Sequence, residues 1–236
     1  MNPYKKLLNR KRKWTPVQTT KGKIKYGAEE AVYRALAVRN MECPVGAFVS
    51  DSLSEIPQKS RELLESNIKD EDNHDLALGY IANAIGVDDE AEAEALRLRD
   101  AWIAHPDHTI LKALVIERAI FFVILPFFRF NGDAGLRTVS ADISRDEQIH
   151  VATNSLVCEE LGLKPSQSLD KLRRATINWI MQPLSANADK YLDKKFWLDA
   201  SDRLMYEGKA PQLTETKAAR MPAFFEHANT NLPQYS

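Results

Sequence analysis

Two short stretches of the sequence have the residue types and the spacing of metal ligands. Each contains a glutamate followed three residues later by a histidine: Glu147 and His150 in "DEQIH", and Glu71 and His74 in "EDNH". Residues three apart lie on the same face of a helix, so a carboxylate and an imidazole can approach one ion together. One such pair would be ordinary helix surface. Two pairs are typical of four-helix bundles that hold two metal ions.

Such bundles take one further carboxylate from each of the other two helices. Glu117 is a candidate because it stands in the apolar stretch "VIERAIFF", where an unpaired buried charge would be costly. Glu147 lies 30 residues after it, with the turn "NGDAG" near the midpoint. This spacing is what an antiparallel helix pair needs to bring both carboxylates level.

The first pair of helices should repeat this geometry. Glu42 lies 29 residues before Glu71, with "SEIPQ" near the midpoint. Glu30 is the alternative, although its spacing of 41 breaks the pseudo-symmetry. Pro44 follows Glu42 closely and is expected to kink or end that helix.

The predicted site therefore holds two metal ions per chain between four carboxylates and two imidazoles. Iron and manganese suit this donor set, whereas zinc usually draws cysteine or more histidine. The predicted ligands are Glu42, Glu71, His74, Glu117, Glu147 and His150.

Helical periodicity extends over almost the whole chain, because apolar residues recur at spacings of three and four. We found no Gly-rich phosphate loop, no series of alternating strands and no solenoid repeat. The sequence predicts an all-α protein with a four-helix bundle core and additional helices. The expected helices cover residues 28–42, 59–86, 88–105, 109–130, 136–161, 166–184 and 186–208.

The composition excludes several classes of protein. A formal net charge of -1 over 236 residues argues against bulk affinity for nucleic acid or anionic membranes. The longest apolar run, residues 119–128, is too short to cross a bilayer. Cys43 and Cys158 form no zinc or disulfide pattern, so a reducing cytoplasm is expected. The basic stretch 1–14 is predicted to be a solvated tail.

Several stretches resemble the small (β) subunit of class I ribonucleotide reductase, a ferritin-like dimetal-carboxylate family. "ISRDEQIH" followed by "VATNSLVCEELGL", with "ERAIFF" upstream, is similar to its metal-binding helices. "KWTP" and "MPAFFEHANTNLPQY" resemble its N-terminal Trp motif and its C-terminal segment. The resemblance extends from about residue 13 to 235. It implies an N-terminal arm at 1–25 carrying Trp14, a ferritin-like helical domain at 26–210, and a tail at 211–236 that binds the large subunit.

The resemblance also implies a function. In this family the metal site reacts with an oxidant and supplies a one-electron hole to the large (α) catalytic subunit, which reduces ribonucleotides to deoxyribonucleotides. Carried over by position, the relay leaves the metals through His74 and passes Asp146, Trp14 and Tyr235. The resemblance implies a homodimer, built from outward helix faces such as those near 88–130. No direct contact with nucleic acid or membrane is expected.

Two departures from the family bear on the metals. Most relatives store the radical on a tyrosine four residues after the first histidine ligand, but here that position is Leu78. Tyr80 should face elsewhere on the helix. The first ligand is predicted to be Glu42, where many relatives use Asp. Both features resemble the subgroup that holds the oxidising equivalent on a Mn/Fe pair, so Mn/Fe is favoured and Fe/Fe is the alternative.

Two other functions are compatible with such a bundle. A ferritin-like di-iron oxygenase or oxidase acting on a small molecule would need a channel to the metals and would not need Trp14 or Tyr235. A non-enzymatic iron-binding protein would hold metal without forming a persistent oxidised state. The bundle by itself does not choose among them.

Overall fold

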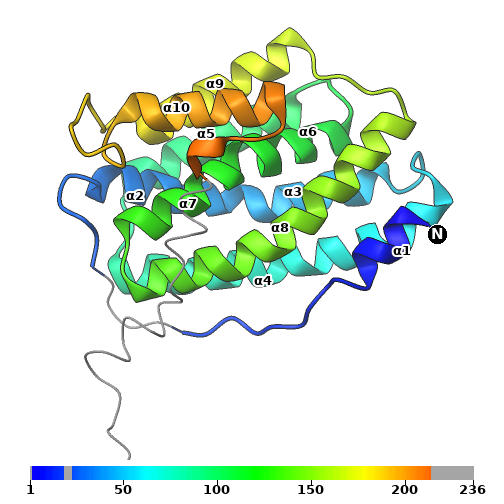
Figure 1. Ribbon diagram of the computed structural model, residues 1–236, viewed down its shortest axis with the longest axis horizontal. Coiled ribbons are helices and arrows are strands. Elements are labelled where there is room, and N and C mark those ends of the chain that lie inside the picture. The colour runs from blue at the N-terminus through cyan, green and yellow to red at the C-terminus, as the bar shows by residue number, and fades with distance from the viewer. Residues whose placement is uncertain (1, 19–22, 214–236) are drawn as a thin grey trace, which may run out of the picture.

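Helices form nearly all the regular structure of residues 2–18 and 23–213, the part of the chain that the computed structural model describes (Figure 1). Within these residues the only β-type pairings are isolated bridges, Ile24 with Gly132 and Ser185 with Asp193. The all-α class predicted from the helical spacing is confirmed.

Four long helical segments lie side by side at the centre of the molecule (Figure 1). The first packs against the second and third, and the fourth packs against the second and third. One of the four is composite. They are α3 (Glu42–Ser52), α4 (Arg61–Ile85), the run of α6 (Thr109–Ile116), π-helical segment η3 (Glu117–Phe121) and α7 (Phe122–Asn131), and α8 (Ala134–Glu160).

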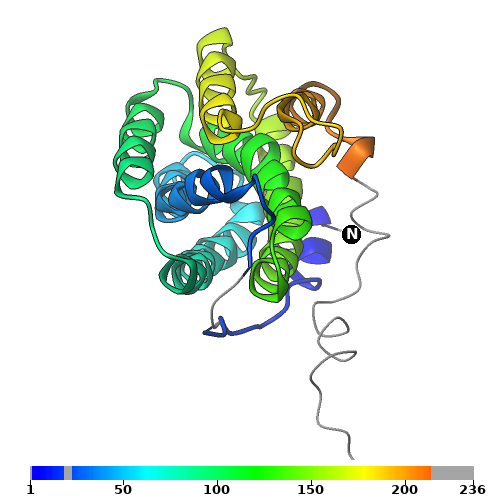
Figure 2. The same ribbon diagram turned by 90° about the vertical axis from the view of Figure 1, so that its left-hand side faces the viewer.

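The remaining helices lie around these segments, as the end-on view shows (Figure 2). One contacts the chain that leads into α3, and two others pack on each other and on the π-helical segment η3. They are α2 (Glu29–Ala37), which continues through η1 (Val38–Met41), then α5 (Asp89–Ala104), α9 (Gln167–Met181) and α10 (Lys194–Glu207), with short turns η2 (Gln58–Ser60) and η4 (Pro211–Leu213).

Helix ends follow local capping chemistry. The side chains of Asp88, Asp133 and Asp193 accept hydrogen bonds from the first turns of α5, α8 and α10. Gly86 ends α4 with a φ of 104°, a conformation that suits glycine. The prediction of a helix from residue 186 was wrong by several residues, because Asp193 caps α10 and the chain before it forms turns.

The helical run is interrupted just before Pro44. The chain breaks upstream, at the 3-10 turn η1, and α3 begins afresh at Glu42. Pro44 then stands in the first turn of α3, where a backbone N–H has no intrahelical acceptor to lose. The expected disruption lies in the turn directly before Pro44, so that Glu42 stands at a helix start rather than at a helix end.

The N-terminal stretch is not a solvated tail. Residues Pro3–Leu8 form α1, which contacts α4 and α8. Tyr4 is 1% exposed, and its hydroxyl donates to Glu160 at 2.9 Å. Residues 9–18 then run along α4 and α8 (Figure 1). The prediction is corrected in part: Lys11 and Arg12 form ion pairs with α4 and α8, whereas the other basic residues of the stretch are exposed.

Among the described residues the run from α6 to α7 is the most buried part, and none of its residues is exposed. Outward helix faces near 88–130 were expected to supply a dimer surface, but residues 109–130 of this range lie in the interior of the protein. Exposed apolar residues in that region belong to α5, where Leu96 and Ile103 are 36% and 50% exposed. In the described residues, no helix has the combined length and hydropathy that crossing a bilayer requires.

Candidate metal centre

The central segments bring together all six residues whose spacing predicted a metal site. Helix α3 contributes one, α4 two, the π-helical segment η3 one and α8 two, and each is at most 2% exposed. We call these residues the six-residue cluster: Glu42, Glu71, His74, Glu117, Glu147 and His150.

One half of the cluster surrounds His74. Its Nδ1 lies 3.2 Å from Glu147 Oε1, 3.3 Å from Glu71 Oε2 and 3.8 Å from Glu42 Oε2. One ligand atom from each of these four residues lies within 4.8 Å of all the others. The arrangement has the size and the donor types of a site for one metal ion.

The other half surrounds His150. Its Nδ1 lies 3.0 Å from Glu71 Oε1 and 3.7 Å from Glu117 Oε1, and these three residues again meet the 4.8 Å limit. Glu71 belongs to both halves and directs one oxygen toward each imidazole, whose ring centroids are 5.5 Å apart. This geometry is compatible with two ions that share the carboxylate of Glu71.

Several polar atoms of the six-residue cluster are buried without a hydrogen-bond partner, and they indicate whether metal ions fit between these residues. Both carboxylate oxygens of Glu42 and of Glu147, Oε2 of Glu71, and Nδ1 of both histidines are buried without a hydrogen-bond partner. A buried polar group without a partner costs about 1–3 kcal/mol, and more when it is charged. Two divalent cations would supply partners for these atoms and would balance the four carboxylates. The donor set fits such ions, and it does not identify the metal.

The electrostatics of the cluster are strongly perturbed. Burial raises the pKa of Glu42 and that of Glu117 well above the ordinary value, and neighbouring carboxylates add to the shift. Burial acts to lower the pKa of His74 and His150, but the surrounding carboxylates outweigh it and raise both. Burial acts to raise the pKa of Glu71, yet the charge of His150 leaves it below its ordinary value. Perturbation of this kind is concentrated at functional sites.

Glu117 begins the π-helical segment, a rare conformation that is frequent at functional sites. Its Oε2 accepts a hydrogen bond from Asn154 Nδ2 at 2.7 Å. In the same segment, the carbonyl of Ala119 accepts a hydrogen bond from Ser201 Oγ at 2.7 Å. Arg173 Nη1 in turn donates to Ser201 Oγ at 2.7 Å. Helices α9 and α10 therefore brace the backbone that carries Glu117.

On the outer side of His74, the predicted Asp146 and Trp14 lie in direct contact. His74 Nε2 is 3.4 Å from Asp146 Oδ2, and Trp14 Nε1 donates to the same oxygen at 2.5 Å. Burial acts to raise the pKa of Asp146, but the hydrogen bonds from His74 and Trp14 lower it. The Trp14 and His74 rings stack with centroids 6.2 Å apart. Tyr235 lies outside the described residues.

Sequence reasoning missed Asp70, which occupies the corresponding place beside the other histidine. His150 Nε2 is 2.9 Å from Asp70 Oδ2, and the same carboxylate forms an ion pair with Lys11. A signal was present, since "DEDNH" at 70–74 and "DEQIH" at 146–150 both place an aspartate directly before the glutamate.

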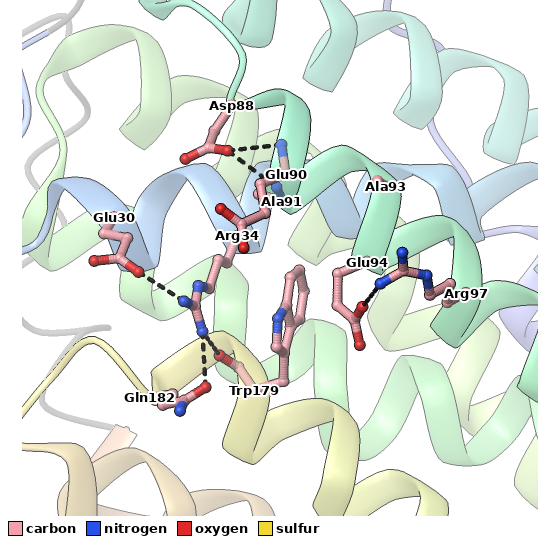
Figure 3. A pocket seen from close by; sticks show the side chains of 10 residues that line it. All are labelled: Glu30, Arg34, Asp88, Glu90, Ala91, Ala93, Glu94, Arg97, Trp179 and Gln182. Atoms are coloured by element: carbon pink, nitrogen blue, oxygen red, sulfur yellow. Dashed lines mark hydrogen bonds and ion pairs between the residues drawn. The ribbon is translucent and has the colours of Figure 1, made fainter.

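Glu30, the alternative first ligand, lies elsewhere. It forms an ion pair with Arg34 at 2.6 Å and lines a surface pocket of about 340 Å³ with Trp179 and Gln182 (Figure 3). Arg34 also donates to the Trp179 carbonyl and to the Gln182 side chain. None of the residues that line this pocket belongs to the six-residue cluster, so the pocket is not an entry to it.

Comparison of the chain with protein families, curated proteins and solved structures found no match.

Proposed function

We propose that the chain is the radical-generating small subunit of a class I ribonucleotide reductase, built on a ferritin-like bundle. The six-residue cluster would hold two metal ions per chain. When bound, these ions would react with an oxidant and supply a one-electron hole for the large subunit, where ribonucleotides are reduced to deoxyribonucleotides. Partners under this proposal are a second copy of the chain and a large subunit bound through residues 211–236.

The observation that carries the proposal is the contact of Trp14 with the outer side of His74. Asp146 Oδ2 lies between them, 2.5 Å from the indole nitrogen and 3.4 Å from the imidazole nitrogen. Metal binding requires only a carboxylate that orients the imidazole. It does not require an oxidisable ring on the same oxygen, whereas a relay to another subunit does.

The protein groups have distinct tasks in this proposal. Asp146 orients His74 so that Nδ1 faces the carboxylates of the cluster. The same carboxylate accepts the indole N–H of Trp14 and can take its proton when the ring loses an electron. The guanidinium of Arg12 lies 5.5 Å from the centre of the indole ring and 3.8 Å from Asp146 Oδ1, and so helps to fix both groups.

Leu78 supports a metal-based oxidant. It is fully buried on α4, four residues after His74, where most of the family has the radical tyrosine. A leucine side chain cannot store a hole, and Tyr80 is only half-buried two positions further on. We therefore favour a Mn/Fe pair, with Fe/Fe as the alternative.

The experiment combines metal loading with a substitution. Apo-protein is loaded with Fe(II), or with Mn(II) and Fe(II), exposed to oxygen and examined by EPR. It is then assayed for ribonucleotide reduction with its large subunit. We expect a coupled Mn/Fe signal without a tyrosyl doublet, and activity that falls to background in Trp14→Phe while the metal signal persists.

Trp179→Phe is the matched control, because Trp179 also lies under an arginine, at 5.5 Å, but has no contact with the cluster. It should leave activity and metals unchanged. Wild-type activity in Trp14→Phe would refute the relay. Oxygen consumption without a persistent oxidised state, with or without Trp14, would instead indicate an oxidase that acts on a small molecule.

A further inference from the structure

Each histidine of the six-residue cluster is contacted, on the side away from the cluster, by an aspartate of the other helix. Asp146, which precedes Glu147 on α8, contacts His74 of α4, and Asp70, which precedes Glu71 on α4, contacts His150 of α8. Both aspartates are in turn contacted by the N-terminal arm. Trp14 donates to Asp146, whose other oxygen lies 3.8 Å from Arg12, and Lys11 forms an ion pair with Asp70.

Lys11 is held in an environment that is unusual for a lysine. Its side chain is 10% exposed, and the Asp70 side chain that it contacts is 13% exposed. The ammonium also donates to Asn67 Oδ1 at 2.9 Å, and Asn67 is itself 2% exposed. Lysine is almost never buried to this degree unless it is paired, and here its partner is Asp70.

We infer that Lys11 is a positioning residue for the metal ion beside His150. Through Asp70 it fixes the imidazole with Nε2 directed outward and Nδ1 directed at Glu71 and Glu117. The inference rests on the metal-binding part of the proposed function, and it requires neither the radical relay nor a large subunit.

Lys11 and Asp70 act on His150 through geometry and through charge. A carboxylate that accepts the outer N–H of a ligand histidine fixes the ring and raises its basicity, and loss of such a partner typically lowers metal affinity about 10- to 100-fold. Asp70 also adds one more negative charge beside a cluster that already contains four carboxylates. The ammonium of Lys11 offsets that charge, so Asp70 can stay against His150 without turning toward solvent.

The Lys11 side also differs chemically from the Trp14 side. An indole can lose an electron, whereas an ammonium has no electron to give at accessible potentials. The arm therefore gives one histidine an outward neighbour that can carry a hole, and gives the other a neighbour that serves only to position it.

The test is titration of apo-protein with Mn(II), followed by calorimetry and by EPR, in Lys11→Met and Lys11→Arg. Lys13→Met is the matched control, because it removes the same charge from an exposed position of the same arm. His150→Ala supplies the reference for binding of a single ion. We expect Lys11→Met to weaken one of the two binding steps about 10- to 100-fold, toward the His150→Ala pattern, with the other step unchanged. Lys11→Arg should restore the lost step, and Lys13→Met should match the wild type.

Asp70→Asn keeps the shape of the side chain and an acceptor for His150, so it provides a second test if Lys11→Met does not fold. It should show the same selective loss. Two unchanged steps in both variants would overturn the inference, as would an equal weakening of both steps, which would mean that the arm only stabilises the fold. Failure of wild-type protein to bind two ions would refute the metal site itself, and so the proposed function with it.

Discussion

Replacement of Glu42 by glutamine should have opposite effects on the metal-free protein and on its response to metal. Glu42 is fully buried, and neither carboxylate oxygen has a hydrogen-bond donor. Its nearest ionic partner, His74 Nδ1, is 3.8 Å away and has closer contacts with Glu71 and Glu147. Burial raises the pKa of Glu42 well above its ordinary value, so at neutral pH this carboxyl destabilises the metal-free fold whether it stays charged or takes up a proton. An amide of the same shape has no such cost.

The size of the effect follows from this burial. A buried polar group without a partner costs about 1–3 kcal/mol, and the amide can relieve a cost of this size because it can donate to the unpaired oxygens of Glu71 and Glu147, which lie within 4.8 Å. For a chain of 236 residues, about 1 kcal/mol shifts the melting temperature by roughly 2–4 °C. Metal-free Glu42→Gln should thus melt roughly 2–12 °C above the wild type. Calorimetric melting in a chelator measures this difference.

With metal the comparison changes. An ion present at 100 times its dissociation constant stabilises the wild type by about 2.7 kcal/mol. If loss of the ligand weakens that ion about 100-fold, as loss of a mere supporting contact can, the gain falls to about 0.4 kcal/mol. The rise in melting temperature on addition of Mn(II) should therefore be much smaller in Glu42→Gln.

Glu30→Gln is the control, since Glu30 was the rival first ligand and its side chain is 58% exposed. Its pair with Arg34 is worth about 0.2–1 kcal/mol at most, so metal-free stability should fall slightly and the response to metal should not change. The reasoning is refuted if Glu42→Gln lowers metal-free stability and leaves the response to Mn(II) intact. Glu42 would then be a structural partner of His74.

Two further substitutions test the supports of the cluster. A Cβ on Gly46 would lie 3.3 Å from Glu71 Cγ, so Gly46→Ala should weaken Mn(II) binding although alanine favours the helix. Gly79→Ala is the control, because a Cβ there would have no atom within 4 Å. It should add about 1 kcal/mol of unfolding free energy and leave Mn(II) binding unchanged. Ser201→Ala removes the donor to the Ala119 carbonyl and should cost about 1–3 kcal/mol in urea unfolding, with weaker binding of the ion beside Glu117.

The sequence was sufficient for the placement of the six-residue cluster because the relevant signals are local. Helical periodicity puts Glu71 and His74 on one face, and a spacing of about 30 residues brings two carboxylates level across an antiparallel turn. The same spacing favoured Glu42 over Glu30, and the structure places Glu30 in an ion pair on the surface. The break at η1, which lets α3 begin at Glu42, was indicated only by Pro44, and a proline alone does not show on which side of Glu42 the helix is interrupted.

The arm and the π-helical segment could not be predicted in the same way. A stretch rich in lysine and arginine shows no apolar periodicity, and only its contacts with acids on other helices determine whether it is solvated. Lys11 contacts Asp70 and Arg12 contacts Asp142, at separations of more than 50 residues. The π-helical segment that begins at Glu117 likewise has a distant contact, because Ser201 donates to the carbonyl of Ala119, 82 positions earlier.

The crossed aspartates also make the cluster dependent on the register of two helices. Asp70 pairs with His150 and His74 with Asp146, an inverted order that only antiparallel α4 and α8 can satisfy. A shift of one residue along either helix would separate both pairs together and would turn Nδ1 of each imidazole away from the carboxylates. Because each histidine has one aspartate beside its Nε2, helices α4 and α8 give both histidines the same neighbour on the side away from the cluster. The arm introduces a distinction between them, and under the proposed function it is therefore the arm that determines the side on which a hole leaves the centre.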